Sequence, residues 1–313
     1  MTSTTPLYSV VVPVYCSEQT LEPLCARILD VFDKHLAQTV EIILVDDASS
    51  DGSWDRMQNL HKNDGRIRII QLAGNFGQHN ALMCGFAHAR GEYVVTLDDD
   101  LQHPPEEISK MIVALQDHPN TDVIIGAYES KQHSWVRNAG TRAMNMFSSL
   151  VLGKDPKLQM TSFRLIRRYI VEAIIKLEME NPRVGRLILE TTNRIVNTPV
   201  RHDPRKYGKS GYSFRRLVKD FVGNILNNSA VPLEMISYLG FVSASVSFLL
   251  AIYYLYRYFF VGISIAGWTT LVLLNLFYFG TLLFSVGIIG EYLIRILRET
   301  KRMPQYVIRE KQL

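Results

Sequence analysis

Two kinds of segment alternate through the first 126 residues of the chain. One kind is short, continuously apolar and rich in Val and Ile, and the other is longer with apolar residues at helical spacing. Continuous apolar strands separated by helices are typical of a parallel sheet that is covered on both faces. The pattern therefore predicts a doubly wound α/β domain. Its expected strands are 8–15, 40–46, 67–72, 92–98 and 121–127, and its expected helices are Glu18–His35, Gly52–Lys62, Gln78–Ala89 and Pro104–Gln116.

The last third of the chain has a different pattern. No residue is charged from Ile236 to Tyr256, and none is charged again from Tyr258 to Gly290. A helix that crosses a bilayer needs about 20 apolar residues. Both runs exceed the usual length of a buried core helix, which is the alternative reading. We expect two transmembrane helices, at about 236–256 and 268–290.

The distribution of Lys and Arg predicts how these two helices are oriented. Arg257 is the only charge between the two apolar runs, whereas basic residues are frequent in 201–219 and 295–302. By the positive-inside rule both termini are cytoplasmic and the short link at 257–267 faces the other side. The net charge of +4 reflects these basic flanks. Beside two apolar runs, such flanks favour anionic lipid headgroups or phosphates over nucleic acid.

Two further segments have one apolar face. The segment 213–228 is basic on its other face and directly precedes the first apolar run, so we expect it to lie in the membrane interface. The alternative is a helix packed on the soluble domain. The segment 135–151 is similar but weaker, and core and interface remain open for it. The expected organisation is a catalytic domain at 1–212, a juxtamembrane amphipathic helix at 213–232, a transmembrane hairpin at 233–292 and a basic cytoplasmic tail at 293–313.

The N-terminal residues and the cysteines give little further information about function. The first 15 residues lack the basic, apolar and small-residue regions of a signal peptide. Cys16, Cys25 and Cys84 show no metal-ligand spacing, and a cytoplasmic location would keep them reduced.

Acidic residues follow two of the expected strands. Asp46 and Asp47 end the second strand, and Asp98, Asp99 and Asp100 end the fourth. In such sheets ligands bind beyond the carboxyl ends of the strands. Three consecutive aspartates raise one another's pKa unless a positive charge compensates them. A divalent cation with a nucleotide diphosphate would supply that charge.

The spacing of the second acidic group suits Mg²⁺ or Mn²⁺, which take one or two carboxylates together with phosphate oxygens. If the strand geometry persisted, Asp98 and Asp100 would share one side, and the amide oxygen of Gln102 would follow two residues later. The alternative is that these aspartates only form a turn or cap, because Pro104-Pro105-Glu106-Glu107 starts a helix.

These motifs together carry a resemblance. The runs Val11-Val12-Pro13-Val14-Tyr15 with Glu18, Val45-Asp46-Asp47-Ala48-Ser49 and Asp98-x-Asp100-Leu101-Gln102 resemble family-two glycosyltransferases of the GT-A (Rossmann-like) fold. The chain is most similar to their polyprenyl-phosphate branch, which includes dolichol-phosphate mannose synthase and the bacterial undecaprenyl-phosphate sugar transferases. The runs Asn75-Phe76-Gly77-Gln78-His79 and Arg205-x-x-Gly208-Lys209-Ser210-x-Tyr212, with the paired apolar segments, agree with the bacterial subgroup.

The resemblance implies an inverting enzyme that moves a sugar from a nucleotide-sugar donor, UDP-linked in the bacterial subgroup, to a polyprenyl phosphate. Its donor side would use Asp47 for the base, in a pocket with Pro13, Tyr15 and Glu18, and Asp98 for the ribose. Asp98, Asp100 and Gln102 would hold Mg²⁺ or Mn²⁺, with Asp100 counted as catalytic.

The resemblance also implies an acceptor side. Arg137 and Arg205, both counted as catalytic, would bind the lipid phosphate together with Lys209 and Ser210. It further implies a multi-pass protein of the bacterial inner membrane that assembles as a homo-oligomer, often a tetramer, and serves cell-envelope glycans such as lipopolysaccharide.

The chemistry agrees with this set of residues. The leaving nucleoside diphosphate needs bound metal and cations to offset its charge. The nucleophile is a phosphate monoester with a second pKa of about 6, so it is largely dianionic at neutral pH and needs little deprotonation. Many relatives carry an aspartate near the equivalent of 157–167, sometimes regarded as a base. Here Asp155 is the nearest acid, so either it shifts in or no side-chain base is used, and we favour the second.

Other functions fit the sequence less well. A processive polysaccharide synthase on the same core would need a Gln-x-x-Arg-Trp-type acceptor segment, which is absent from this sequence. A non-catalytic scaffold does not explain the retained Asp47, Asp98, Asp100 and Gln102. A lipid-glycan transporter usually carries polar groups inside its membrane helices.

Overall fold

The computed structural model describes residues 5–128, 158–177, 182–203 and 304–313, with isolated positions between 249 and 296. The chain forms two units. The first comprises Met1–Ser149, Lys154–Lys209 and Arg302–Leu313, and the second comprises Leu150–Gly153 and Ser210–Lys301. Within the described positions, no helix is both long enough and apolar enough to cross a membrane. The expected transmembrane segments lie largely outside those positions.

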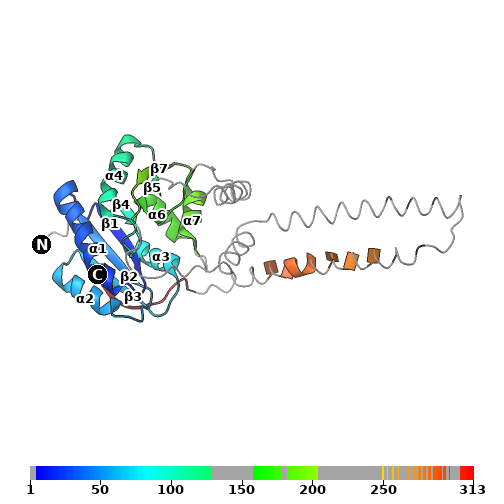
Figure 1. Ribbon diagram of the computed structural model, residues 1–313, viewed down its shortest axis with the longest axis horizontal. Helices are drawn as coiled ribbons and strands as arrows, with labels where there is room; N and C mark the ends of the chain where they lie inside the picture. Colours follow the sequence, from blue (N-terminus) through cyan, green and yellow to red (C-terminus); the bar gives the residue numbers. More distant parts are fainter. Residues whose placement is uncertain are drawn as a thin grey trace. The chain divides into compact units, whose positions relative to one another are not determined.

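The first unit is built on one eight-stranded sheet with the order β7-β5-β6-β4-β1-β2-β3-β8 (Figure 1). Strands β1, β2, β3 and β4 pair in parallel, as do β5 and β7, whereas β6 and β8 run antiparallel to their neighbours. The sheet is therefore mixed, and the expected parallel part is its centre. The strands are β1 Tyr8–Val14, β2 Val40–Asp46, β3 Ile67–Leu72, β4 Tyr93–Thr96, β5 Val123–Tyr128, β6 Arg164–Arg167, β7 Ile195–Val200 and β8 Ile308–Gln312.

Helices cover both faces of this sheet. Side chains of β2 show why its sequence is continuously apolar, since Ile42 and Leu44 pack on one face while Ile43 and Val45 pack on the other. The first face is covered by α1 Glu18–Asp30, which continues as the π-helix η1 Val31–Leu36, and by α2 Ser53–Asn63 and α4 Ile108–Asp117, which follows the 3₁₀ turn η2 Pro105–Glu107. The second face is covered by α3 Gln78–His88, α6 Arg168–Ile175 and α7 Val184–Thr191.

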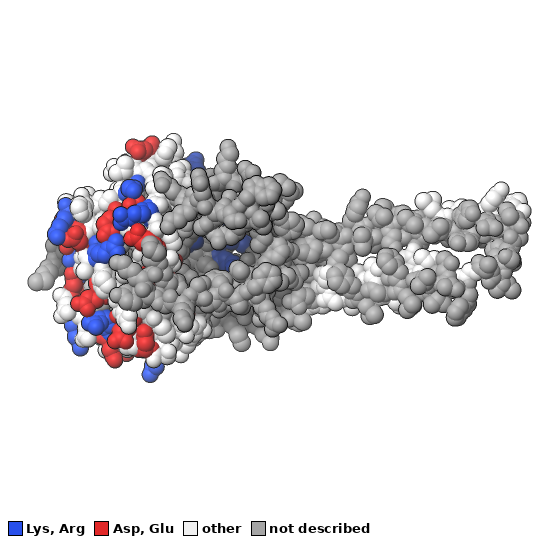
Figure 2. Space-filling model, in the orientation of Figure 1, with Lys and Arg blue, Asp and Glu red and all other residues white. Residues whose placement is uncertain are grey.

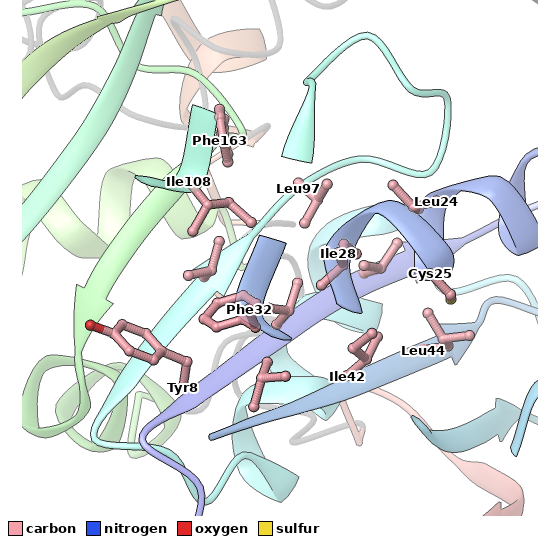
Figure 3. Close-up of a cluster of buried hydrophobic side chains, with 14 of the residues drawn as sticks. Tyr8, Leu24, Cys25, Ile28, Phe32, Ile42, Leu44, Leu97, Ile108 and Phe163 are labelled. Carbon is pink, nitrogen blue, oxygen red and sulfur yellow. The ribbon is translucent and has the colours of Figure 1, made fainter. Parts of the chain in front are cut away.

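The core on the first face is the larger one, and Figure 3 shows part of it. Phe32 from η1 and Phe163, just before β6, are fully buried there with Ile28 of α1. Each fully buried side chain of this size contributes roughly 1.5–3 kcal/mol to folding. This packing fixes where the strands end, and therefore where the acidic residues lie.

The C-terminal residues return to the sheet. Strand β8 pairs antiparallel with the edge strand β3, and the Ala73 amide donates to the Val307 carbonyl over 2.7 Å. Tyr306 and Ile308 pack against the second core. The sequence suggested only a basic tail for this part of the chain, because strand β8, Ile-Arg-Glu-Lys-Gln, has little apolar character of its own.

Candidate active site

The three aspartates after β4 do not continue the strand. Strand β4 ends at Thr96, and Asp99 and Asp100 form a turn that is followed by Leu101 with a φ of 60°. The backbone amide of Gln102 donates to Asp100 Oδ1 over 3.1 Å. The strand geometry on which the alignment of Asp98 with Asp100 depended therefore does not persist. The turn, closed by the amide of Gln102, brings Asp100 and Gln102 together.

Asp98 is held by residues from two distant segments. Gln78 Nε2, at the start of α3, donates to Oδ1 over 2.6 Å, and Ser162 Oγ donates to Oδ2 over 2.6 Å. The side chain of Asp98 is 27% exposed. Both carboxylate oxygens are thus oriented by the protein before any ligand binds.

Asp99 turns toward the end of β1. Its Oδ2 accepts hydrogen bonds from the Tyr15 amide over 3.0 Å and from Ser17 Oγ over 2.5 Å. Burial raises the pKa of Asp99 to about 6, with the neighbouring Asp98 and Asp100 acting in the same direction and the two hydrogen bonds opposing it. Asp99 therefore ties the acidic turn to the loop that carries Tyr15.

Asp47, at the end of β2, is bound by the loop before α3. Its two oxygens accept hydrogen bonds from the backbone amides of Phe76 over 2.7 Å and Gly77 over 2.8 Å. Gly77 has a φ of 90°, which favours glycine. Burial raises the pKa of Asp47, and these two hydrogen bonds oppose that effect. Because Gln78 follows Gly77, the start of α3 contacts both Asp47 and Asp98.

The other residues predicted for the nucleotide pocket lie at the same edge of the sheet. Pro13 is buried within β1, whereas Tyr15 is 52% exposed and Glu18 is exposed at the start of α1. The carboxyl group of Glu18 lies against Gly52, where an added Cβ would approach it to 2.7 Å. The β1–α1 loop and the start of α2 thus pack together beside the end of β2.

A buried arginine lies behind the acids, and the sequence analysis did not identify it. Arg164 begins β6 directly opposite Thr96, the last residue of β4, and only 5% of it is exposed. Its Nε and Nη1 atoms have no hydrogen-bond partner among the described residues. Burial lowers the pKa of Arg164 to about 10, while the charge of Asp98 opposes this, so the guanidinium stays protonated at neutral pH. The only signal in the sequence was one charge inside the apolar run Phe163–Ile166.

An aromatic cluster also borders Asp98. His103 is buried and stacks on Phe163 and Tyr128, with ring centroids 5.3 and 5.7 Å apart. Its Nε2 contacts the Tyr128 hydroxyl, and its Nδ1 lies 3.8 Å from Asp98 Oδ2. The edge of His202, after β7, meets the Tyr128 ring with centroids 4.3 Å apart. These residues were missed because they lie far apart in the sequence.

Several predicted site residues lie outside the described part of the chain. They are the acceptor residues Arg137, Arg205, Lys209 and Ser210, together with Asp155 and the amphipathic segments 135–151 and 213–228. Their roles stay predictions.

The acidic turn provides some, but not all, of the ligands that a hard cation requires. Asp98, Asp100 and Gln102 supply oxygen atoms, which Mg²⁺ and Mn²⁺ prefer. Among the described residues, no group of three or more His, Cys, Asp and Glu could hold a metal ion on its own. The residues present therefore fit an ion whose coordination is completed by the phosphates of a nucleotide, as in sites with one or two carboxylates.

Comparisons with known proteins agree with this architecture. The family model described as glycosyl transferase family 2 matches residues 9–175. The chain is 33% identical over 305 residues to an undecaprenyl-phosphate 4-deoxy-4-formamido-L-arabinose transferase of Proteus mirabilis (strain HI4320), covering 96% of this chain and 93% of that protein. Identity and coverage are the same for the protein of that name from Serratia proteamaculans (strain 568).

Among solved structures, the fold is similar to glucosyl-3-phosphoglycerate synthase from Mycobacterium tuberculosis in complex with Mn²⁺, UDP-glucose and phosphoglyceric acid. The TM-score is 0.52 at 17% identity, covering 71% of this chain and 79% of that one. This likeness supports the GT-A fold. The expected sequence motifs, the sheet that positions them and the family match lead to one conclusion: the chain is a glycosyltransferase that belongs to glycosyl transferase family 2.

Proposed function

We propose that this enzyme transfers a sugar, with inversion, from a nucleotide-diphosphate sugar to polyprenyl phosphate at the cytoplasmic face of the bacterial inner membrane. The observation that carries the proposal is the start of α3, which binds Asp47 through two amides and Asp98 through Gln78. It therefore fixes the two acids proposed for the base and the ribose in one rigid arrangement. Similarity to undecaprenyl-phosphate sugar transferases over 96% of the chain supports the acceptor.

On the donor side, the nucleotide lies over the carboxyl ends of β1, β2 and β4. Asp47 accepts hydrogen bonds from the base, with Pro13, Tyr15 and Glu18 beside it, and Asp98 contacts the ribose. Asp98, Asp100 and Gln102 would hold Mg²⁺ or Mn²⁺, which would supply positive charge to offset that of the donor diphosphate. The donor is UDP-linked in this proposal, following the bacterial subgroup that the chain resembles.

On the acceptor side, the lipid phosphate attacks the anomeric carbon from the face opposite the diphosphate. Because its second pKa is about 6, the phosphate is already dianionic at neutral pH and requires no side-chain base. Arg137 and Arg205 bind its oxygens, with Lys209 and Ser210 beside them, because a guanidinium forms paired hydrogen bonds with phosphate.

A membrane location is part of the proposal. Described positions between 249 and 296 are mostly helical and expose large apolar side chains, among them Leu249, Phe260, Leu271 and Phe279. Exposed apolar surface of this kind marks membrane or protein contacts. With the basic flanks at 201–219 and 295–302, it supports two transmembrane helices with cytoplasmic termini. Assembly as a homo-oligomer, and a role in lipopolysaccharide modification, belong to the same proposal.

The described surface of the first unit carries charges of both signs on the face shown in Figure 2. On that face (Figure 2), Lys and Arg alternate with Asp and Glu, and no single-sign area dominates its described part. Exposed pairs such as Arg27 with Glu106, 2.6 Å apart, neutralise charges locally. This mixed surface differs from the basic face that nucleic acids require.

A transfer assay tests the proposal. Purified protein in detergent, Mn²⁺ and undecaprenyl phosphate is incubated with a panel of nucleotide sugars that begins with UDP-4-deoxy-4-formamido-L-arabinose, the sugar named in its relatives. We expect one donor to give a lipid-linked product by mass spectrometry, with the anomeric configuration inverted. A polymeric product instead would favour a processive synthase. No transfer from any donor, in protein shown to be folded, would refute the proposal.

A further inference from the structure

Most of the buried polar side-chain atoms that lack a hydrogen-bond partner, among the described residues, lie near the carboxyl ends of the strands. In the described part of the chain, six buried side-chain nitrogen or oxygen atoms lack a hydrogen-bond partner. One is Arg68 Nε, at the amino ends of the strands. The other five are His79 Nδ1, Asn80 Oδ1, His103 Nδ1 and the Nε and Nη1 atoms of Arg164, and they belong to the start of α3 or lie around Asp98.

Arg164 is the unusual residue among those near Asp98 because it carries a full charge, whereas Arg68 at the amino ends is paired with Glu41. A buried cation is normally paired and hydrogen-bonded, and each N–H group left unpaired in the interior is costly. The charge of Asp98 acts on Arg164, but both Asp98 oxygens accept hydrogen bonds from Gln78 and Ser162. The described residues thus leave two of the three guanidinium nitrogens of Arg164 without acceptors.

The neighbours of Arg164 point to the donor as the source of those acceptors. Arg164 lies opposite Thr96 at the end of β4, and its charge also acts on His79 in the first turn of α3. The start of α3 is the segment that binds Asp47 and Asp98. The charge of Arg164 also affects the pKa of Tyr128 and of His103, and the charge of Asp98 acts on both residues as well.

We propose that Arg164 is a donor-binding residue whose free guanidinium nitrogens donate to oxygens of the diphosphate of the nucleotide sugar. It also acts as the fixed counter-charge behind Asp98. The inference rests on the proposed donor site and deepens it, because it assigns a phosphate-binding cation that comes from β6 instead of from the residues around the lipid. The inference also predicts that the buried, unpaired charge of Arg164 lowers the stability of the ligand-free enzyme, and that donor binding compensates for this loss.

The test compares Arg164→Met, which removes the charge at similar volume, with Arg164→Lys, which keeps it but has fewer donors. Arg167→Met, at the other end of β6, is the matched control, because Arg167 already binds the carbonyl oxygens of Thr121 and Pro119 over 2.8 Å each. Calorimetry with UDP and with UMP, both with Mn²⁺, measures the donor side. Steady-state transfer measures KM for the donor and for undecaprenyl phosphate separately.

For Arg164→Met we expect UDP affinity to fall and donor KM to rise about 10- to 100-fold, with the lipid KM changed less than about twofold. UMP affinity should fall less than UDP affinity, and Arg164→Lys should be intermediate. The thermal midpoint of the ligand-free Arg164→Met protein should equal or exceed that of wild type, since an unpaired buried charge has gone. Arg167→Met should show the reverse pattern, with a lower midpoint and unchanged donor KM.

Three outcomes would overturn the inference: unchanged UDP affinity in Arg164→Met, equal rises in donor and lipid KM, or a lower ligand-free midpoint without a donor-side defect. If Arg164→Met does not fold, Arg164→Lys decides, and wild-type UDP affinity in that variant overturns the inference. Failure of the proposed function is recognised separately, because wild type itself would then transfer no sugar. If wild type transfers sugar and Arg164→Met binds the donor normally, the inference about Arg164 is refuted while the proposed function stands.

Discussion

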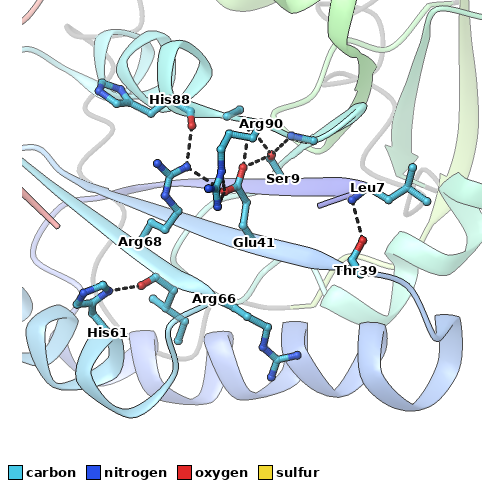
Figure 4. A network of polar contacts seen from close by, with 12 residues as sticks. Leu7, Ser9, Thr39, Glu41, His61, Arg66, Arg68, His88 and Arg90 are labelled. Carbon is cyan, nitrogen blue, oxygen red and sulfur yellow. Dashed lines mark hydrogen bonds and ion pairs between the residues drawn. The ribbon is translucent and has the colours of Figure 1, made fainter. Parts of the chain in front are cut away.

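The sheet carries buried charges at both of its ends, and the two groups are built differently. At the amino ends of the strands, Ser9, Glu41, Arg68 and Arg90 form what we call the amino-end cluster (Figure 4). Glu41 Oε1 accepts from Ser9 Oγ and the Arg90 amide, both over 2.7 Å, and Oε2 accepts from Arg68 Nη1 and Arg90 Nε, both over 2.9 Å. Burial alone would raise the pKa of Glu41, but these bonds and the charge of Arg68 hold it below its usual value.

The basic residues on the surface beside the amino-end cluster also have acceptors, although Arg68 Nε within the cluster lacks a partner among the described residues. A hollow there is lined by Arg90, Arg167 and Arg168, among others. Arg90 binds Glu41, Arg167 binds two backbone carbonyls, and Arg168 binds the Ala89 carbonyl and Glu172. A hollow with basic residues at its edge is therefore no anion site when each of those residues already has its acceptors.

At the carboxyl ends, three aspartates lie close together in sequence. Near them Arg164, His79 and His103 have buried nitrogens that find no partner in the part of the chain that the structure describes. The difference teaches how to separate a structural polar network from a functional one. A buried network in which the charges are paired with one another, as Arg68 and Arg90 are with Glu41, stabilises one fold. A buried cation that leaves most of its donors without acceptors is costly to the free protein, and we look for its explanation in what binds there.

The largest expected effect concerns catalysis at the carboxyl ends. Asp100→Ala should lower transfer at least about 100-fold, because the charge of the diphosphate is then poorly compensated. Glu41→Gln, in the amino-end cluster, should keep turnover per folded molecule near wild type. Transfer assays with Mg²⁺ or Mn²⁺ on folded, membrane-bound protein measure both. Near-normal turnover in Asp100→Ala would contradict the metal assignment.

The next effect concerns stability at the amino ends. Arg68→Met leaves Glu41 buried with less compensation and should lower the free energy of unfolding by about 3 kcal/mol. The matched control is Arg66→Met, two residues earlier, whose pairs with Asp33 and Asp64 are 40% exposed on the arginine side. It should cost at most about 1 kcal/mol. Denaturant unfolding in detergent measures both, and equal losses would show that the amino-end cluster is no more important than a surface pair.

A third prediction uses the pH dependence of His79. Burial, with the charges of Arg164 and Arg183, lowers the pKa of His79 to about 4, against about 6.5 in an unfolded chain. Between these values the folded state binds fewer protons than the unfolded state, so stability falls as the pH drops from 6.5 to 4. His79→Gln should remove about 1–2 kcal/mol of that loss, after allowance for partial exposure.

Unfolding midpoints recorded from pH 7 to pH 4 test this prediction. His118→Gln serves as the control, because His118 is exposed at the end of α4. If His79→Gln and His118→Gln have the same acid sensitivity as wild type, His79 does not carry a buried, lowered pKa.

The last prediction concerns one glycine at the carboxyl ends. Alanine at Gly77 meets no atom within 4 Å but must adopt a φ near 90°. That strain costs about 1–3 kcal/mol unless the loop shifts, and a shift would weaken the amide bond to Asp47. We therefore expect a small loss of stability together with weaker UDP binding. Gly91→Ala, at the amino ends, would instead meet the Ser9 backbone nitrogen at 2.6 Å and should lower stability without changing UDP affinity.

The sequence was sufficient to predict the central strands and the helices between them. Strands β1, β2 and β3 begin and end within one residue of the expected bounds, because both of their faces are buried and their sequences are continuously apolar. The sequence was also sufficient to predict the edge of the sheet where the acids lie, since Asp47 directly follows β2 and Asp98 lies two residues after the end of β4. Strands β6, β7 and β8 were not identified, since they are short or partly exposed and have no comparable periodicity.

What only the tertiary structure decided is which groups meet around those acids. Ser162 is 64 residues from Asp98, and Tyr15 is 84 residues from Asp99. Such contacts depend on strand order, and β6 lies next to β4 although β5 comes between them in sequence. The role of Arg164 depends on this arrangement. In the sequence it is one charged residue in an apolar run, and it cannot be distinguished from a paired buried arginine until its partners are known. Sequence patterns report burial and strand ends, which are local properties of the chain, whereas the pairing or isolation of a buried charge is a property of the assembled sheet.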